Sequence, residues 1–214
     1  ANFIPVAEDI GLIPTLGAWV LEQACEQAVR WLQAGLPPLR MAVNVSALQL
    51  DQSDFVQTVL QTLQRTCLPA AQLELELTES VMLHEMDRTH HTLAQLHAAG
   101  IAISIDDFGT GYSSLSYLSR LPLDKLKIDR AFVKDIDTRP SDAVLCRTIV
   151  AMARNLGLHV TAEGVETTAQ LQALTEYGCT HYQGYLFSRP VPATQLAVLL
   201  TGQADEALRV RQVT

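Results

Sequence analysis

The sequence predicts an α/β fold built on a parallel sheet. Short segments with apolar or β-branched bodies alternate with segments of helical periodicity, an order typical of parallel strands joined by helices. Each strand-like segment also ends in a polar residue, which is typical of strands whose carboxyl ends line a common site. The six predicted strands are 40–45, 73–78, 102–107, 125–129, 159–163 and 180–184.

Helical spacing of apolar residues and the residues at segment ends predict the helices that connect these strands. The first helix has Pro14 near its start and Gly35 after its end, and we expect it to bury Trp19 and Trp31 in the core. The predicted helices are 15–34, 53–66, 87–100, 114–121, 141–156, 167–177 and 193–200.

The number of strands predicts a barrel that lacks its beginning. A closed TIM-like (β/α)₈ barrel has eight strands and about 250 residues, whereas we find six strand-helix units in 214 residues. We therefore expect residues 1–200 to form an N-terminally incomplete barrel domain with its first strands missing, followed by a tail at 201–214. Because an open barrel leaves strand edges unpaired, we expect a fragment of a longer chain or a symmetric partner that covers the edge.

Composition excludes several classes of protein. A hydrophobic content of 48% argues against disorder, and a net charge of -8 argues against binding duplex nucleic acid. The four cysteines form no CxxC pair, so we expect neither a zinc site nor a disulfide framework, but reduced thiols of a cytoplasmic domain. No apolar run approaches the ~20 residues of a membrane span, so we expect no membrane contact from this segment.

The polar strand ends predict a single site. They are Asn44, Glu76, Asp106, Asp129, Glu163 and Gln183. Any one of them alone is more simply explained as a helix cap or turn residue. Together with Asp107 they place five carboxylates at one end of the sheet, and clustered carboxylates suit Mg²⁺ or Mn²⁺. Adjacent aspartates at 106 and 107 can serve two cations at once.

The most specific string is DDFGTGYSSLSYL at residues 106–118, in which two glycines allow a tight loop after the paired aspartates. Its DFG triplet also occurs in protein kinases, but the other kinase motifs are absent. Four more motifs accompany it in order: ELTES at 76–80, KIDR at 127–130, AEGVE at 162–166 and QGYLFSRP at 183–190. With FIPVAE at 3–8 and NVS at 44–46, the chain resembles the EAL domain family of cyclic di-GMP phosphodiesterases over nearly all of its length.

The resemblance implies a (β/α)₈ barrel with one antiparallel strand, which hydrolyses cyclic di-GMP to linear pGpG in bacterial signalling. It implies that Asn44, Glu76 and Asp106 ligate one divalent cation. Asp106, Asp107 and Glu163 would ligate a second, and Glu163 is also the family's candidate general base. The resemblance further implies cyclic di-GMP as the ligand, a homodimer, and a sensory or GGDEF-type domain upstream in the parent protein.

Further roles follow from the same match. Lys127 is expected to hydrogen-bond the attacking water, although a simple salt bridge is the alternative. Glu79 is expected to anchor the DDFGTG loop, and Glu166 to position its neighbours. The predicted substrate-binding residues are Asp129, Gln183, Phe187, Arg189 and Pro190. A core position is the alternative for Phe187.

The sequence departs from the family pattern at one place and leaves two other functions open. In the family, a Glu-Ala-Leu motif with a metal-binding Glu and a nearby phosphate-binding Arg lies upstream of FIPVAE, and no such motif precedes Phe3 here. One alternative is a catalytically inactive module that senses cyclic di-GMP. The other is an enolase-like barrel that abstracts a proton with Mg²⁺ and a lysine base, which suits the paired aspartates less well.

Overall fold

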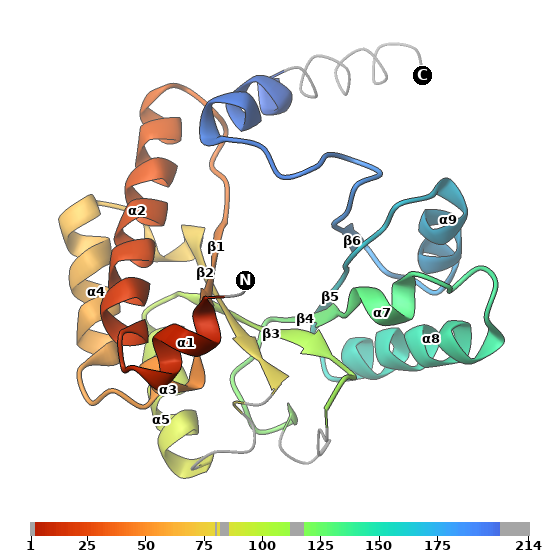
Figure 1. Cartoon of the computed structure of the whole chain (residues 1–214), viewed down its shortest axis with the longest axis horizontal. Helices are drawn as coiled ribbons and strands as arrows, with labels where there is room; N and C mark the ends of the chain where they lie inside the picture. Colours follow the sequence, from red (N-terminus) through yellow and green to blue (C-terminus); the bar gives the residue numbers. More distant parts are fainter. Residues whose placement is uncertain (1–2, 80, 82–85, 112–117, 202–214) are drawn as a thin grey trace.

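A computed structural model describes residues 3–79, 81, 86–111 and 118–201, and these residues form a six-stranded sheet with helices around it (Figure 1). The strands lie in the order in which they occur in the chain, and all five neighbouring pairs are parallel. Consecutive parallel strands joined by helices are the building units of a (β/α)₈ barrel, so the predicted fold class is confirmed. The antiparallel strand that the family resemblance implies is not among these six. They are β1 Met41–Val45, β2 Leu73–Thr78, β3 Ala102–Phe108, β4 Lys125–Ile128, β5 His159–Ala162 and β6 His181–Tyr182.

The long helices agree with the sequence predictions to within two residues at each end. They are α2 Ile13–Gln33, α4 Phe55–Thr66, α5 Met86–Ala98, α8 Pro140–Asn155 and α9 Thr168–Glu176. A helix at 193–201 follows them, as predicted. The predicted helix at 114–121 falls largely outside the described residues, and so does nearly all of the predicted tail at 201–214.

Four short elements were not predicted, because each is too brief to show a helical period. They are α1 Ile4–Asp9, α3 Ala47–Leu50, the 3₁₀ turn Ala70–Gln72 and α7 Arg130–Val133. Local hydrogen bonds explain two of them. Ser46 caps α3 and shares a capping box with Gln49, while the Asp129 carboxylate accepts a hydrogen bond from the backbone of Ala131 at the start of α7.

The two faces of the sheet differ in polarity. Side chains alternate between faces along a strand, and the residues that pack against the helices are apolar: Leu73, Leu75 and Leu77 of β2 are fully buried, as are Ile103 and Ile105 of β3. Each buried side chain of this size contributes about 1.5–3 kcal/mol. The positions in between include Glu74, Glu76 and Asp106, so the opposite face of the sheet carries charged residues.

The prediction that Trp19 packs in the core is wrong, since this side chain is 58% exposed. Helix α2 buries Leu21, Cys25 and Ala28, which follow a spacing of four and three residues. Trp19 precedes Leu21 by two residues, which is about 200° around a helix and therefore on the opposite side. Trp31 is half-buried.

The sheet is open within the described part of the chain, where β1 and β6 each pair with one neighbour only. Figure 1 shows the chain running from β6 across this open side to the helix at 193–201. None of the described helices combines the length and apolar character that a membrane span requires. All four cysteines are free, and Cys67 alone among them is exposed.

Candidate metal centre

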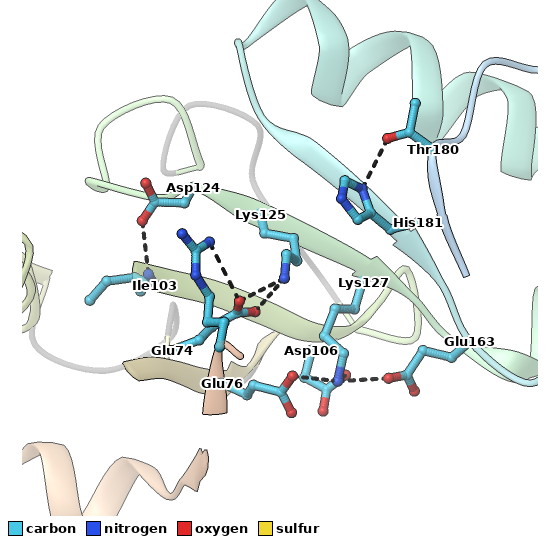
Figure 2. A network of polar contacts seen from close by, with 11 residues as sticks. Glu74, Glu76, Ile103, Asp106, Asp124, Lys125, Lys127, Glu163, Thr180 and His181 are labelled. Atoms are coloured by element: carbon cyan, nitrogen blue, oxygen red, sulfur yellow. Dashed lines mark hydrogen bonds and ion pairs between the residues drawn. The ribbon is translucent and has the colours of Figure 1, made fainter. Parts of the chain in front are cut away.

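Three carboxylates at the carboxyl ends of different strands surround one lysine at that end of the sheet. Nζ of Lys127 lies 2.9 Å from Oε1 of Glu76 and 3.1 Å from Oδ1 of Asp106. Its distance to Oε1 of Glu163 is 2.6 Å. Figure 2 shows these four side chains pointing toward one another from β2, β3, β4 and the residue after β5. Three of the predicted strand ends, those of Glu76, Asp106 and Glu163, therefore meet at one point, as expected for the carboxyl ends of parallel strands.

Lys127 stays charged at this position. Its side chain is almost completely buried, and burial by itself would lower its pKa. The hydrogen bond to Glu163 and the charge of Glu76 outweigh that effect, so the pKa of Lys127 is raised above its ordinary value. The alternative that Lys127 forms salt bridges is thus confirmed, and a hydrogen bond from this ammonium group to a water stays a prediction.

A bulge lets both adjacent aspartates reach the same site. In a regular strand, Asp106 and Asp107 would point to opposite faces. The β3–β4 register shifts between Ile105 and Phe108, and Asp107 has a left-handed backbone with φ of 54°. As a result, oxygens of Asp106, Asp107 and Glu163 all lie within 4.8 Å of one another, a spacing that allows them to hold a metal ion.

The cluster contains more negative charge than its lysine can balance. Burial, a carboxyl hydrogen bond with Asp129 and the charge of Asp106 raise the pKa of Asp107 to about 6. Burial also raises the pKa of Glu76, although Lys127 opposes this shift. Five carboxylates, counting Asp129, thus interact around a single ammonium group. Such a set of hard oxygen donors fits divalent cations, which would relieve the repulsion.

A comparison with known protein families decides the relationship of this chain. A model of the EAL domain matches residues 1–190. The chain belongs to the EAL domain family.

Curated relatives of this EAL domain include two Pseudomonas aeruginosa proteins. The bifunctional diguanylate cyclase/cyclic di-GMP phosphodiesterase MucR is 48% identical over 195 residues, covering 91% of this chain and 28% of MucR. The cyclic di-GMP phosphodiesterase NbdA is 47% identical over 206 residues, covering 96% of this chain and 26% of NbdA. The chain therefore spans about a quarter of the length of these relatives.

Solved structures of the family have the same fold. The MucR phosphodiesterase in complex with cyclic di-GMP is similar with a TM-score of 0.87 at 48% identity, covering 91% of this chain and 79% of that one. A manganese/cyclic di-GMP complex of Klebsiella pneumoniae BlrP1 is similar with a TM-score of 0.76 at 31% identity, covering 83% of this chain and 45% of that one.

The pairing of β1 with β2 brings Asn44 next to Glu76 of the acidic cluster. Asn44 of β1 is the register partner of Glu76 of β2, and its side chain is exposed. An amide oxygen at this position could add a metal ligand without adding negative charge.

The tripeptide Glu-Ala-Leu does occur in the chain, at 206–208. It follows the last described strand and does not lie upstream of FIPVAE, so it does not match the position of the family motif.

Glu79 contacts the loop that carries the aspartates. Its Oε2 accepts hydrogen bonds from the backbone N–H groups of Gly109, at 2.9 Å, and Gly111, at 3.1 Å. The Glu79 side chain is buried, so these contacts are shielded from water. This is the anchoring contact that the family resemblance implies, while its effect on catalysis stays a prediction.

The remaining predicted site residues lie on loops at the same end of the sheet. Gln183 follows β6 and pairs through its backbone with Ala162 and Val165. Phe187 is 49% exposed and stacks on Tyr182, with ring centroids 6.5 Å apart, so the alternative of a core position is wrong. The guanidinium of Arg189 lies 4.4 Å from the centre of the Tyr185 ring. Glu166 and Pro190 are exposed. In the described part of the chain, no side-chain hydrogen bond or ion pair joins these residues to the Lys127 cluster.

Sequence reasoning missed a second charged layer on the same face. Nζ of Lys125 lies 2.6 Å from Oε2 and 2.9 Å from Oε1 of Glu74, which is 2% exposed. Nη1 of Arg40 lies 4.0 Å from the same carboxylate. The signal was present in the sequence: Glu74 and Lys125 each precede a cluster residue by two positions, so they share its face of the sheet.

A cavity of about 250 Å³ lies on the other side of the sheet, between α2, α4 and β1. Val43, Val45 and Leu75 line it, and these residues belong to the apolar face. Its polar lining residues offer no paired carboxylates. The acidic cluster on the polar face is therefore the better candidate for the site of this EAL domain.

Proposed function

We propose that this EAL domain hydrolyses cyclic di-GMP to linear pGpG in a reaction that depends on Mg²⁺ or Mn²⁺, two ions per site. The observation that carries the proposal is the cluster of five carboxylates around Lys127. The names of MucR and NbdA support cyclic di-GMP as the substrate. Lowering the level of this second messenger would be the role of the parent protein in bacterial signalling.

The donor set supports an assignment of residues to the two proposed ions. Asn44, Glu76 and Asp106 would hold one, and Asp106, Asp107 and Glu163 would hold the other. When bound, the ions supply a lowered pKa for a water molecule and charge stabilisation for the phosphoryl oxygens. The manganese complex of BlrP1 supports this choice of metal.

The chain's own groups would then position and deprotonate the water. Lys127 is held in place by three carboxylates and retains its positive charge, so its N–H groups are suited to hydrogen-bond the attacking water. Glu163 would accept the proton, and Gln183 would support the same water. Glu79 would keep the 106–111 loop in place, and Glu166 would position neighbouring loop residues.

Substrate contacts would come from the loops beyond the strands. The exposed ring of Phe187 is available to stack on a guanine base, with Arg189 and Pro190 beside it in the chain. Asp129 forms a hydrogen bond with Asp107 and would contribute to substrate binding at the same site. We further propose a cytoplasmic location, a homodimer, and an upstream sensory or GGDEF-type domain in the parent protein.

The test is to follow pGpG formation from cyclic di-GMP by chromatography with Mn²⁺ or Mg²⁺ present. The 214-residue chain is compared with an Asp106→Asn variant and with a version extended upstream to carry a Glu-Ala-Leu segment. We expect metal-dependent turnover that the Asp106→Asn substitution lowers by roughly 1,000-fold.

The outcomes separate the possibilities. Turnover by the short chain means that the upstream glutamate is dispensable or is supplied by a partner chain. Turnover only by the extended version assigns the active unit to the longer domain. Binding of cyclic di-GMP without turnover by either version would contradict the proposal and favour the sensing module.

A further inference from the structure

We propose that Gln170 is a positioning residue for the metal centre, because it ties the loop that follows Glu163 to helix α7. The inference rests on the proposed function and deepens it. Glu163 is the first residue after β5, and residues 163–167 form the loop between β5 and helix α9. The position of its carboxylate therefore depends on what holds this short loop.

Gln170 makes more contacts than a helix cap requires. It lies at the third position of α9 and forms a capping box with Thr167. Beyond that box, its Oε1 accepts a second hydrogen bond from the N–H of Glu166 at 2.7 Å. Its Nε2 donates to the carbonyl of Lys134, the C-cap of α7, at 2.9 Å. The side chain is 5% exposed, so these bonds are protected from water.

The same chain contains a comparison. Gln49 occupies the equivalent position in the capping box of α3, is also buried, and bonds back to the N–H of Ser46 at 3.2 Å. The bonds of Gln170 to a second loop amide and to another helix have no counterpart among the hydrogen bonds described for Gln49. Gln170 thus joins two elements that are 36 residues apart in the chain.

The loop at 163–167 also packs closely against β4, α7 and the residues after β6. The N–H of Glu163 donates to Ile128 of β4, and the N–H of Val165 donates to the carbonyl of Gln183 after β6. A Cβ atom on Gly184 would lie 2.2 Å from the Val165 carbonyl oxygen, so the two loops meet backbone to backbone. Gly164 has φ of +69°, and a Cβ there would lie 2.5 Å from Cβ of Arg130 in α7.

Gln170 therefore connects the two backbone segments that hold two residues of the cluster, Glu163 and Asp107, in place. One is the loop of Glu163, whose Oε1 lies 2.6 Å from Nζ of Lys127. The other is α7, whose N-cap Asp129 interacts with Asp107. Because a shift of about 1 Å in a reacting group costs on the order of 100-fold in rate, a loosened loop affects the site even though Gln170 does not touch it.

A single substitution separates this link from helix capping. Glutamate is a usual partner in capping boxes, so Gln170→Glu keeps an acceptor for the loop amides but loses the donor to Lys134. At pH 8, where the new carboxylate is ionised, we expect Mn²⁺ affinity and kcat to fall about tenfold with KM for cyclic di-GMP little changed. The neutral substitution Gln170→Asn is expected to cause a similar loss of Mn²⁺ affinity and kcat, since the shorter side chain cannot reach the carbonyl of Lys134 at the end of α7.

Two controls are matched to it. Gln172→Glu adds the same charge on the exposed face of the same helix, and Thr167→Ala removes the other half of the capping box. Both are expected to keep Mn²⁺ affinity within about twofold, and Thr167→Ala to lower the melting temperature by a few degrees.

Amide hydrogen exchange of the metal-free protein tests the link without metal or substrate. We expect the amides of Glu163 and Val165 to exchange about tenfold faster in Gln170→Glu than in the parent chain and in Gln172→Glu. Unchanged exchange overturns the inference, and so does faster exchange with Mn²⁺ affinity and kcat retained. If the parent chain itself neither binds Mn²⁺ nor turns over, the proposed function fails, and the exchange rates still decide whether Gln170 holds the loop.

Discussion

Two charged layers on the polar face of the sheet, two residues apart along the strands, differ in their charge balance. In the layer nearer the amino ends of the strands, the Glu74 carboxylate contacts Lys125 and lies near Arg40. In the layer at the carboxyl ends, Lys127 contacts three carboxylates. Asp107 interacts with two of these carboxylates and also with Asp129, which brings the total to five. The first layer has the cations it needs, whereas the second has an excess of negative charge.

This difference indicates different roles for residues of the same type. A buried carboxylate with its own lysine is a structural ion pair, whose removal leaves an uncompensated charge. A group of buried carboxylates with too few cations is held together at a cost in stability, and such sites are typical of metal binding. Removing the carboxylate of the amino-end layer should therefore lower stability and leave activity unchanged. Removing a carboxylate of the carboxyl-end layer should lower activity and change stability little.

The largest expected contrast is between Asp106→Asn and Glu74→Gln. Loss of a carboxylate shared by both proposed ions should lower kcat by roughly 1,000-fold, since such ions supply several kcal/mol to the transition state. The metal-free protein should keep its melting temperature to within a few degrees, because the cluster loses a repelling charge. Glu74→Gln should instead lower the melting temperature and leave the kcat of the folded protein unchanged. Turnover assays beside thermal unfolding in EDTA measure both, and an active Asp106→Asn protein would contradict the assignment.

The second contrast uses the two lysines, Lys127→Met and Lys125→Met. Each substitution leaves a buried carboxylate without its ammonium partner, so each should lower the free energy of unfolding by about 3–5 kcal/mol. Saturating Mn²⁺ should restore much of this stability in Lys127→Met, because cations can replace the missing charge there. No such recovery is expected for Lys125→Met. Urea unfolding with and without Mn²⁺ measures the difference, and equal recovery of both variants would argue against a metal site at the carboxyl-end layer.

A third prediction concerns pH. The folded-state pKa of Asp107 is raised to about 6 from an ordinary value of 3.8, so the folded protein binds more protons than the unfolded chain between these values. Stability of the metal-free protein should therefore fall as pH rises from about 4 to 6. In Asp107→Asn this contribution is absent, so the variant should gain in melting temperature relative to the parent chain as pH increases. Thermal unfolding in EDTA from pH 4 to 7 checks this, and a constant difference between the two proteins would contradict it.

The same titration should also appear in metal binding. Because a cation binds the ionised carboxylate, Mn²⁺ affinity should decrease as pH falls through about 6, by up to tenfold per pH unit for one displaced proton. Glu74→Gln is the matched control and should follow the parent profile. Calorimetric titration with Mn²⁺ at several pH values provides the measurement.

The smallest effect is expected for Arg40→Met. The guanidinium lies 4.0 Å from the Glu74 carboxylate and is about half exposed, and surface ion pairs of this kind contribute about 0–1 kcal/mol. Lys125 keeps Glu74 paired when Arg40 is removed. A loss of more than about 2 kcal/mol in urea unfolding would mean that the amino-end layer depends on both cations.

Most of the fold could be predicted from the sequence because its strands and long helices have strong local patterns. The strand from Leu73 to Thr78 and the helix ending before Gly100 were predicted almost to the residue. Short helices such as α7 could not be predicted, since four residues show no period. Trp19 was misplaced because apolar character alone does not decide which side of a helix faces the core.

The candidate site was predicted through the polar strand ends, but its contacts were not. Periodicity places Asp106 and Asp107 on opposite faces, and it was the β3 bulge and the left-handed backbone of Asp107 that brought both to one cluster. Likewise, the Glu74–Lys125 pair joins strands 51 residues apart in the chain. Its two members share a face by local pattern, but their contact depends on strand register.

The sequence by itself thus determined that this chain is a series of strand-helix units with acidic residues at the strand ends, because alternation and periodicity are properties of neighbouring residues. Only the tertiary structure decided which charges meet. It placed three carboxylates on Lys127, balanced Glu74 with Lys125, and linked the Glu163 loop to α7 through Gln170. The physical reason is that these contacts depend on distances of a few ångströms between residues remote in sequence, which are set by register, bulges and loop packing.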